Sequence, residues 1–358
     1  MRKLLVLLSA VALMVAFTVP AIAADKSVSF YGRVWMDTFI EDYSKEATGT
    51  DFDDSDLRWD MNDNGTSRFG ANFKWDNMSA NIEIRPYSAS MYRQWWGSYN
   101  FGGGSLLIGH TWSPLYINTT ICGQCEAGGT AGGYGFWVGD LRQAQIRLTM
   151  GGLTVALVEP NASAVNGAAG ADTDTTLPKL EATYALKLGS IALVPFLGWN
   201  SYDIVDTATD QSKSVDGMVY GITAKAGFGP GYVNGQIWMT QNGKEWGDLY
   251  HTGFGAYFDG TKVVDEDGMG YSVTAGMKLS DTMSFEVGYG SVEYELDRPG
   301  TWEDDASSMY AQLNIGIAKG FTVTPEIGVI DYGEQINDGV KTKEGDMTYY
   351  GAVWKIHF

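Results

Sequence analysis

The two cysteines stand three residues apart, as Cys122-Gly123-Gln124-Cys125, and offer the most obvious chemistry in the sequence. A redox-active pair would need a helix N-terminus to lower a thiol pKa, and this glycine-rich stretch predicts none. Haem attachment needs a histidine after the second cysteine, where Glu126 stands, and a zinc site needs a second pair of ligands. In an oxidising compartment, neighbouring thiols on one loop are expected to form a disulfide.

The three histidines are the candidates for a catalytic base, and none has the setting that catalysis requires. Acyl transfer needs a base within hydrogen-bond reach of a nucleophile. His251 falls in a long loop, His357 is next to the chain end, and His110 is isolated. The sequence has no Gly-x-Ser-x-Gly turn and no phosphate-binding loop with a lysine. We therefore expect neither enzymatic activity nor a cofactor or metal site.

The composition describes an exported, folded, acidic protein. The 358 residues carry a formal charge of −19, which argues against nucleic-acid binding, and 13% are aromatic, which argues against disorder. Arg2 and Lys3 precede an apolar run from Leu4 to Phe17, and Ala21-Ile22-Ala23 follows as a cleavage signal. This order predicts a secretory signal peptide over 1–23 and a mature domain over 24–358, because the run is too short for a spanning helix.

The mature chain alternates apolar and polar residues with the period of a β-strand. From Phe69 to Trp75, for example, apolar side chains fall on every second position. The expected strands span 27–40, 67–76, 79–87, 91–101, 105–111, 140–150, 153–160, 178–188, 191–201, 217–228, 232–240, 268–280, 283–295, 306–318, 321–334 and 346–358.

The connections between these strands alternate between short and long. Gaps of two or three residues, such as Gly151-Gly152, alternate with gaps of roughly 10–28 residues, except for the three residues from Ser88 to Ser90. A soluble β-sandwich has no reason to alternate in this way. A transmembrane barrel does, because it has short periplasmic turns and long outer loops.

A barrel would place the apolar faces in lipid and enclose water with the polar faces. No backbone group can stay unpaired in lipid, so only a closed sheet satisfies so many half-apolar strands. Tryptophans near strand ends are expected at the headgroup level on the outside. These are Trp35, Trp75, Trp96, Trp199, Trp238 and Trp354.

At the level of motifs the sequence resembles the general bacterial porins of Gram-negative outer membranes. Val28 to Val34 is similar to the first strand of such porins, and Ser67 to Gly70 to their second strand. Gly104 to Tyr116 resembles the strand that leads into their third loop, with His110 where arginine is common. The last strand resembles the family's assembly signal through Trp354, Ile356 and the terminal Phe358.

The resemblance implies a trimeric, sixteen-stranded barrel whose third loop folds inward and narrows the channel. That loop would be Trp112 to Gly139, and the Cys122–Cys125 disulfide would stiffen it. The residues expected at the constriction are Arg33, Arg68, Arg85, Arg93, Arg142, Arg147, Glu126 and Asp140. The expected partners are outer-membrane lipid and lipopolysaccharide, the barrel assembly machinery, two further copies of the chain, and small hydrophilic solutes and ions.

Strand parity places ten basic and five acidic residues on the inner wall. The basic residues are Arg33, Arg68, Lys74, Arg85, Arg147, Lys179, Lys187, Lys225, Lys278 and Lys355, and the acidic residues are Asp37, Glu83, Glu181, Glu286 and Glu326. The net charge of the protein favours cations, whereas the wall favours anions. At the constriction the charges of the wall are expected to count for more than the net charge, because charges beyond about 8 Å are screened at physiological salt. The ion preference nevertheless stays open.

Taken together, the sequence predicts an all-β, transmembrane antiparallel barrel of about sixteen strands, with short periplasmic turns, long outer loops and an inward-folded third loop. Its expected function is passive diffusion of ions and small hydrophilic solutes across the outer membrane. The alternatives are a substrate-specific channel with a stacked aromatic track, an outer-membrane barrel enzyme, and an exported adhesin.

Overall fold

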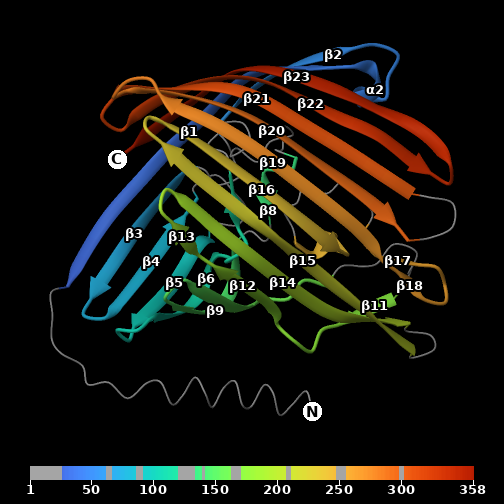
Figure 1. Cartoon of the computed structure of the whole chain (residues 1–358), viewed down its shortest axis with the longest axis horizontal. Helices are drawn as coiled ribbons and strands as arrows, with labels where there is room; N and C mark the ends of the chain where they lie inside the picture. Colours follow the sequence, from blue (N-terminus) through green and yellow to red (C-terminus); the bar gives the residue numbers. More distant parts are fainter. Residues whose placement is uncertain are drawn as a thin grey trace.

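The computed structural model describes residues 26–61, 67–85, 92–119, 134–138, 142–162, 171–206, 211–246, 255–297 and 302–358. These residues form sixteen antiparallel strands in one sheet, which closes on itself because the last strand pairs with the first (Figure 1). The strands in chain order are β1 (Ser27–Tyr43), β2 (Asp54–Asp60) continued by β3 (Arg68–Trp75), β4 (Met78–Ile84), β5 (Tyr92–Asn100), β6 (Ser105–Trp112), β9 (Arg142–Met150), β10 (Leu153–Val158), β11 (Ala171–Asp174) continued by β12 (Lys179–Tyr184) and β13 (Leu186–Leu188), β14 (Ile191–Asp206), β15 (Gln211–Phe228), β16 (Gly231–Gln241), β19 (Glu266–Lys278), β20 (Met283–Leu296), β21 (Trp302–Ala318), β22 (Phe321–Asn337) and β23 (Val340–His357). The predicted barrel is confirmed.

The remaining elements are short and belong to the connections. They are α2 (Lys45–Thr48), β7 (Ile117–Asn118), β8 (Trp137–Val138), η1 (Gly243–Trp246), β17 (Tyr257–Phe258) and β18 (Val263–Val264). None of the helices in the described ranges is long and apolar enough to cross a bilayer.

The first barrel strand holds the ends of the chain together. Its C-terminal half, Asp37–Tyr43, pairs with β2, and its N-terminal half, Ser27–Arg33, pairs with β3, so β2 and β3 act as one interrupted strand. On its other side, β1 pairs with β23, from Arg33 opposite His357 to Tyr43 opposite Met347. One residue further towards the C-terminus of the chain, Phe358 exchanges two backbone hydrogen bonds of 2.8 and 3.0 Å with Gly32. The barrel is therefore closed down to the last residue.

The short turns occur where the sequence predicts them, but two of the long loops are mostly strand. The predicted gaps at 202–216 and 335–345 are largely occupied by the extended ends of β14, β15, β22 and β23. Asp338 and Gly339, with φ of 50° and 79°, close the second of these ribbons as a two-residue turn. Positive φ at both positions suits the twist of paired strands, and Asp-Gly is its usual sequence. Paired strands can continue past the membrane because each satisfies the backbone of the other.

The outer face of the barrel is apolar, as predicted. Phe30 is 69% exposed, and its ring stacks on Phe69 of the neighbouring strand with 6.1 Å between the centroids. Ile108, Ile146 and many other large apolar residues are exposed in the same way. Such a surface is stable only against lipid, so this face meets the acyl chains.

Three of the six tryptophans predicted for the outer face lie inside instead. Trp35 and Trp238 are fully buried, and Trp96 donates a hydrogen bond of 3.2 Å to Gln94 on the inner wall. For Trp35 the parity of β1 decides the matter, because Arg33 and Asp37, two positions either side, point inward as well. Trp354, by contrast, is exposed on the outside and donates to Thr38 at 2.9 Å.

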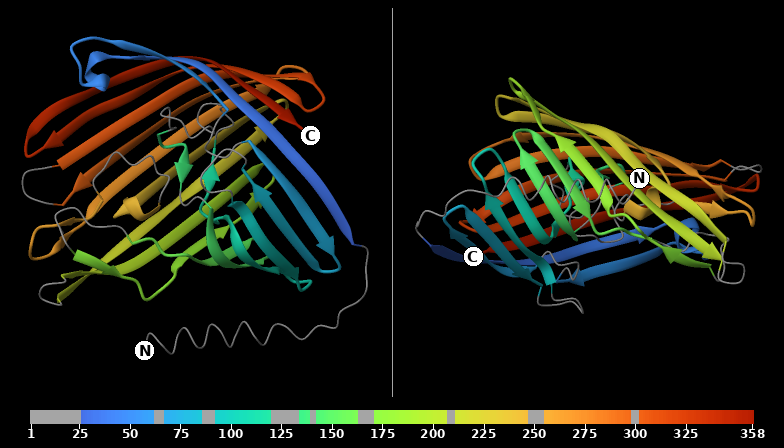
Figure 2. Two further views of the ribbon diagram at one scale, coloured as in Figure 1. Left: turned by 180° about the vertical axis from the view of Figure 1, so that it is seen from behind. Right: turned by 90° about the horizontal axis from the view of Figure 1, so that it is seen from below.

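The barrel has a low wall and a high wall. The seven elements β3, β4, β5, β6, β9, β10 and β12 have six to nine residues each. From β14 to β23 the barrel strands have eleven to eighteen residues. Figures 1 and 2 show the long strands, in yellow to red, rising on one side of the molecule.

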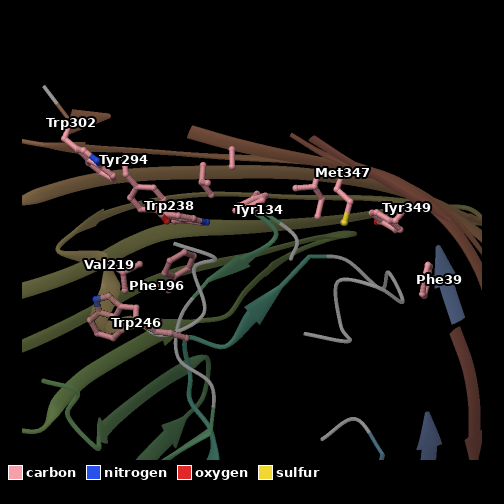
Figure 3. Close-up of a cluster of buried hydrophobic side chains, with 14 of the residues drawn as sticks. Phe39, Tyr134, Phe196, Val219, Trp238, Trp246, Tyr294, Trp302, Met347 and Tyr349 are labelled. Atoms are coloured by element: carbon pink, nitrogen blue, oxygen red, sulfur yellow. The ribbon is translucent and has the colours of Figure 1, made fainter. Parts of the chain in front are cut away.

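The inside of the high wall carries a buried aromatic cluster. Trp238, Tyr294, Trp302, Phe196 and Tyr134 belong to it (Figure 3). Tyr134 comes from the segment between β6 and β9, and it packs edge-on against Tyr332 with 6.5 Å between the ring centroids. The interior is thus wet only in part, since loops cover the aromatic side chains of the high wall.

Candidate functional site

The third loop enters the barrel and is fastened to the high wall. Two pieces of it, Trp112 to Thr119 and Tyr134 to Val138, are described, and their short strands β7 and β8 pair with each other. The carbonyl oxygen of Thr119 accepts a hydrogen bond of 2.9 Å from Thr274, and that of Gly135 accepts one of 2.6 Å from Gln236. The predicted inward-folded loop is confirmed in these pieces.

Glycines allow the loop to approach the wall closely. Gly135 has a φ of +75°, and a side chain there would collide with the backbone oxygens of Tyr271 and Ser291. On the wall, Gly198 leaves room for Leu115 of the loop and Trp246 of η1. At these glycines the loop and the wall therefore come closer together than side chains at the same positions would allow.

On the low wall, four arginines lie in the region of Glu83, and two of them bind its carboxylate. Glu83 of β4 accepts hydrogen bonds from Arg93 Nε at 2.6 Å and from Arg68 at 3.5 Å. Arg142, at the start of β9, lies within electrostatic reach of Arg68, Arg85 and Glu83. These residues come from neighbouring strands that the sequence separates by up to about 70 positions.

A β-bulge adds one of these arginines to the inner wall. Opposite β4, the register shifts between Glu83 and Ile84, which pair with Gln94 and Tyr92 and leave Arg93 unpaired in the ladder. Both Arg93 and Gln94 then reach Glu83, which a regular strand would not permit for consecutive residues. Sequence parity could not assign Arg93, because a bulge leaves no mark on the alternation.

Further basic residues of the inner wall come from β1 and β23, where the two ends of the chain meet. Arg33 of β1 is the register partner of Arg68, and Lys355 of β23 is the partner of Trp35. We call Lys355, Arg33, Arg68, Arg85 and Arg142 the basic belt. Arg147, also predicted at the constriction, lies apart from the belt and donates to the carbonyl oxygen of Trp112 at 3.2 Å.

The predicted wall acids are placed very differently from these bases. Asp37, Glu83, Glu181, Glu286 and Glu326 are each 4% exposed or less, whereas the residues of the basic belt are only partly buried. Other side chains of the protein hydrogen-bond to or pair with these carboxylates. Tyrosine hydroxyls donate to Glu83 at 2.8 Å (Tyr31), to Glu286 at 2.6 Å (Tyr310) and to Glu326 at 2.8 Å (Tyr349), and Arg58 pairs with Asp37 at 3.3 Å. Counting each wall charge equally is therefore wrong, since the basic belt is partly exposed and the five acids are buried. Of the bases predicted for the wall, Lys179 is also fully buried, with its Nζ 4.8 Å from the ring centroid of Trp246.

Aromatic rings support several of the inward-facing bases. Arg142 lies 4.3 Å and Arg93 5.4 Å from the ring centroid of Trp112. In the same way, the Arg33 guanidinium lies 4.5 Å and Lys355 Nζ 3.6 Å from the ring centroid of Trp35. The sequence suggested no such role for Trp112 and placed Trp35 on the outer face, although Trp35 shares the parity of Arg33.

Four residues predicted for the third loop and the constriction lie outside the described residues, namely Cys122, Cys125, Glu126 and Asp140. At the chain end, Trp354, Ile356 and Phe358 project outward beside β1, with Phe358 70% exposed. Their role in assembly stays a prediction.

Solved structures similar to this chain are outer-membrane channels. DcaP of Acinetobacter baumannii matches with a TM-score of 0.67 and 17% identity, covering 95% of this chain and 100% of that one. Outer-membrane OmpT of Vibrio cholerae matches at 0.59 and 15%, covering 95% and 100%. An anion-selective porin from Comamonas acidovorans matches at 0.58 and 14%, covering 93% and 100%. At these identities the likeness shows the fold, and a comparison with curated protein sequences gave no match.

A closed sixteen-stranded barrel with an apolar outside, a charged inside and an inward loop defines a membrane channel. The sequence profile of the Gram-negative porins matches residues 10–335, and the chain belongs to that family. It forms an outer-membrane channel for the passive diffusion of solutes, and its family and fold point to a non-enzymatic role.

Proposed function

We propose that this porin prefers small hydrophilic anions, which pass a constriction between the basic belt and the third loop. The observation that carries the proposal is the unequal burial of wall charges. The basic belt is partly exposed, while the five wall acids are buried and hydrogen-bonded. A solute that passes the inner wall therefore meets the exposed bases of the belt rather than these five carboxylates.

The short distance between the basic belt and the solute path favours the belt, rather than the net charge of the protein, as the source of ion preference. Charges further than about 8 Å from the solute path are screened at physiological salt, so the acidic outer loops count little at the narrowest point. Selectivity is set where solute and wall are closest. Arg33, Arg68, Arg85 and Arg142 are the wall side of that constriction in our proposal, with Arg147 nearer the loop base. Glu126 and Asp140 are its loop side.

Arg93 has a different part in this proposal from the one its charge suggests. Its side chain is 3% exposed and its Nε lies 2.6 Å from Glu83. The pair cancels locally, so Arg93 supports the wall and neutralises Glu83 rather than attracting solute.

Reversal potentials in planar bilayers test the proposal. Arg142→Gln and Arg68→Gln should each lower the anion-to-cation permeability ratio by about twofold or more, because each removes a charge at the constriction. Lys319→Gln is the matched control, since Lys319 is exposed on a periplasmic turn. Equal ratios for the wild type and both constriction variants would refute the proposal.

We further propose a homotrimer, with the low wall at its centre. A membrane-spanning strand needs about 9–11 residues, whereas β4, β6 and β10 of the low wall have seven, eight and six. Packing copies against one another would remove this wall from lipid. A solved form of the similar OmpT of Vibrio cholerae is a trimer. Conductance steps that close in threes would support this assembly, and strictly single steps would contradict it.

The remaining parts of the proposal come from the sequence. Residues 1–23 act as a secretory signal peptide, and a Cys122–Cys125 disulfide stiffens the third loop. The apolar outer face contacts outer-membrane lipid and lipopolysaccharide, and the terminal Phe358 is recognised by the barrel assembly machinery. Mass spectrometry of the mature protein, with and without reduction, tests the first two statements directly.

A substrate-specific channel is the second candidate, because the loop does carry stacked aromatic rings. Trp112 and Tyr116 stack with 3.9 Å between centroids, and Tyr116 lies 5.2 Å from Trp137. However, the rings of Trp112 and Tyr116 cover each other, the Arg142 guanidinium lies over the Trp112 ring, and Trp137 is buried. The stack offers little free face to a passing solute, which favours the general channel.

A further inference from the structure

Trp112 occupies a junction between the constriction loop and the arginines of the low wall. It is the last residue of β6, and its ladder partner on β9 is Arg142. The Arg142 guanidinium lies 4.3 Å from its ring centroid, and the Arg93 guanidinium lies 5.4 Å from it. One ring is thus in cation–π range of two arginines on two different strands.

The two arginines would otherwise be an unfavourable pair. They repel each other, and Arg68 adds to the repulsion on both. Glu83 lies 2.6 Å from Arg93 and therefore holds that side chain. Arg142 rests on the ring. The face of an indole attracts a guanidinium but carries no unit charge, so this contact orients Arg142 without cancelling its charge.

The ring is itself held by the loop. Tyr116 stacks on Trp112 at an interplanar angle of 25°, and Trp137 of β8 lies against Tyr116. Trp137 in turn belongs to a buried cluster with Phe136 and Tyr310 of the high wall. The position of the Arg142 support is therefore set by the inward loop and, through it, by the opposite wall.

The same arrangement occurs a second time on the inner wall. Trp35 is fully buried and carries Arg33 at 4.5 Å and Lys355 at 3.6 Å, while its own Nε1 donates to Asp37 at 2.7 Å. Two tryptophans thus each support two cations. This repetition indicates a common way of holding basic side chains in the lumen.

We propose that Trp112 is a specificity-determining positioning residue of this porin, whose ring holds the Arg142 guanidinium at the constriction with its charge intact. The inference rests on the proposed function, because it assumes that Arg142 contributes to ion preference. Trp112 need not touch the solute. It acts through Arg142.

The test compares Trp112→Leu and Trp112→Phe in planar bilayers. Neither variant changes the charge of the protein. Trp112→Leu should lower the anion-to-cation permeability ratio by about two- to threefold, because the orienting face is lost, whereas Trp112→Phe should retain most of the ratio. Circular dichroism in detergent and regular conductance steps confirm that each variant is folded.

Two further measurements separate positioning from a merely structural role. In an Arg142→Gln background, Trp112→Leu should change the ratio little further, since its target is gone. Trp137→Leu loosens the stack that holds the Trp112 ring without contacting the arginines, so it should lower the ratio in the same direction as Trp112→Leu and change it little further in the Arg142→Gln background. Additive effects of Trp112→Leu and Arg142→Gln, an unchanged ratio for Trp112→Leu, or a Trp137→Leu effect on the ratio that persists in the Arg142→Gln background would each overturn the inference.

The failure of the proposed function would look different. A wild-type protein that prefers cations would refute the anion preference. The inference would still be tested by whether Trp112→Leu and Arg142→Gln shift the ratio by the same amount and whether their combination shifts it no further.

Discussion

Arg33 and Arg68 are register partners across the ladder of β1 and β3, so two guanidinium groups stand side by side on the inner wall. Like charges directly opposite each other destabilise a sheet. The arrangement makes sense where positive potential in the lumen is worth more than the stability it costs. On the other side of β1, Lys355 of β23 continues the basic belt across the seam where the two ends of the chain meet.

The Arg33–Arg68 pair predicts a trade-off. Arg33→Gln should lower the anion-to-cation permeability ratio and at the same time raise the free energy of unfolding by about 0.2–1 kcal/mol, because the cross-strand repulsion is relieved. Urea unfolding in detergent micelles, together with reversal potentials, measures both. A variant that is less stable and equally selective would contradict this account of the pair.

Glu83 should matter for stability out of proportion to its single charge. It is 2% exposed and receives Arg93, Arg68, Gln94 and Tyr31. Glu83→Gln would leave the buried Arg93 without its carboxylate, at an expected cost of about 3–5 kcal/mol.

The control for this variant is Glu334→Gln. Glu334 pairs with Lys341 at 3.3 Å, but both side chains are largely exposed. Such a pair contributes about 0–1 kcal/mol. Equal losses of unfolding free energy for the two variants would show that the environment of Glu83 is not as described.

Gly135 should determine how closely the third loop packs against the high wall. Gly135→Ala introduces a Cβ into the backbone oxygens of Tyr271 and Ser291, at a φ that disfavours side chains. We expect the loop to shift and single-channel conductance to change by tens of per cent, on the order expected for a displaced constriction. Gly103→Ala, on a turn with open space around it, should leave conductance unchanged. Identical conductance in both variants would mean that the loop does not depend on this contact.

The terminal residue should be needed for closing the barrel. Phe358 exchanges two backbone hydrogen bonds with Gly32, and its ring covers that glycine. Deletion of Phe358 removes both bonds, so the yield of folded protein in the outer membrane should fall severalfold. Phe358→Tyr keeps the backbone and the ring and should assemble normally. Normal yields from the deletion would argue against the assembly role.

Much of the barrel can be predicted from the sequence, because the alternation of lipid-facing and water-facing residues is strict. The pattern from Phe69 to Trp75 and the Gly151-Gly152 turn, for example, reappear as β3 and as the turn between β9 and β10. The upper ends of the strands could not be predicted. Above the membrane neither face meets lipid, so ribbons such as β22 and β23 lose their alternation while their backbones stay paired.

The site could be predicted only as a set of residue types. Arg33 and Arg68 follow parity and are placed as expected, whereas Arg93 depends on a bulge that the sequence does not reveal. The burial of Glu286 and Glu326 depends on tyrosines from neighbouring strands, Tyr310 and Tyr349, which only the strand register brings together. Long-range pairing, rather than local pattern, decides which charges a solute can reach.

The zero-current potential of the wild-type channel across a potassium chloride gradient is the most direct test of the central claim. The account predicts stepwise conductance and a potential whose sign reports greater permeability of chloride than of potassium. A potential of the opposite sign, or folded protein that leaves the bilayer non-conducting, would contradict it.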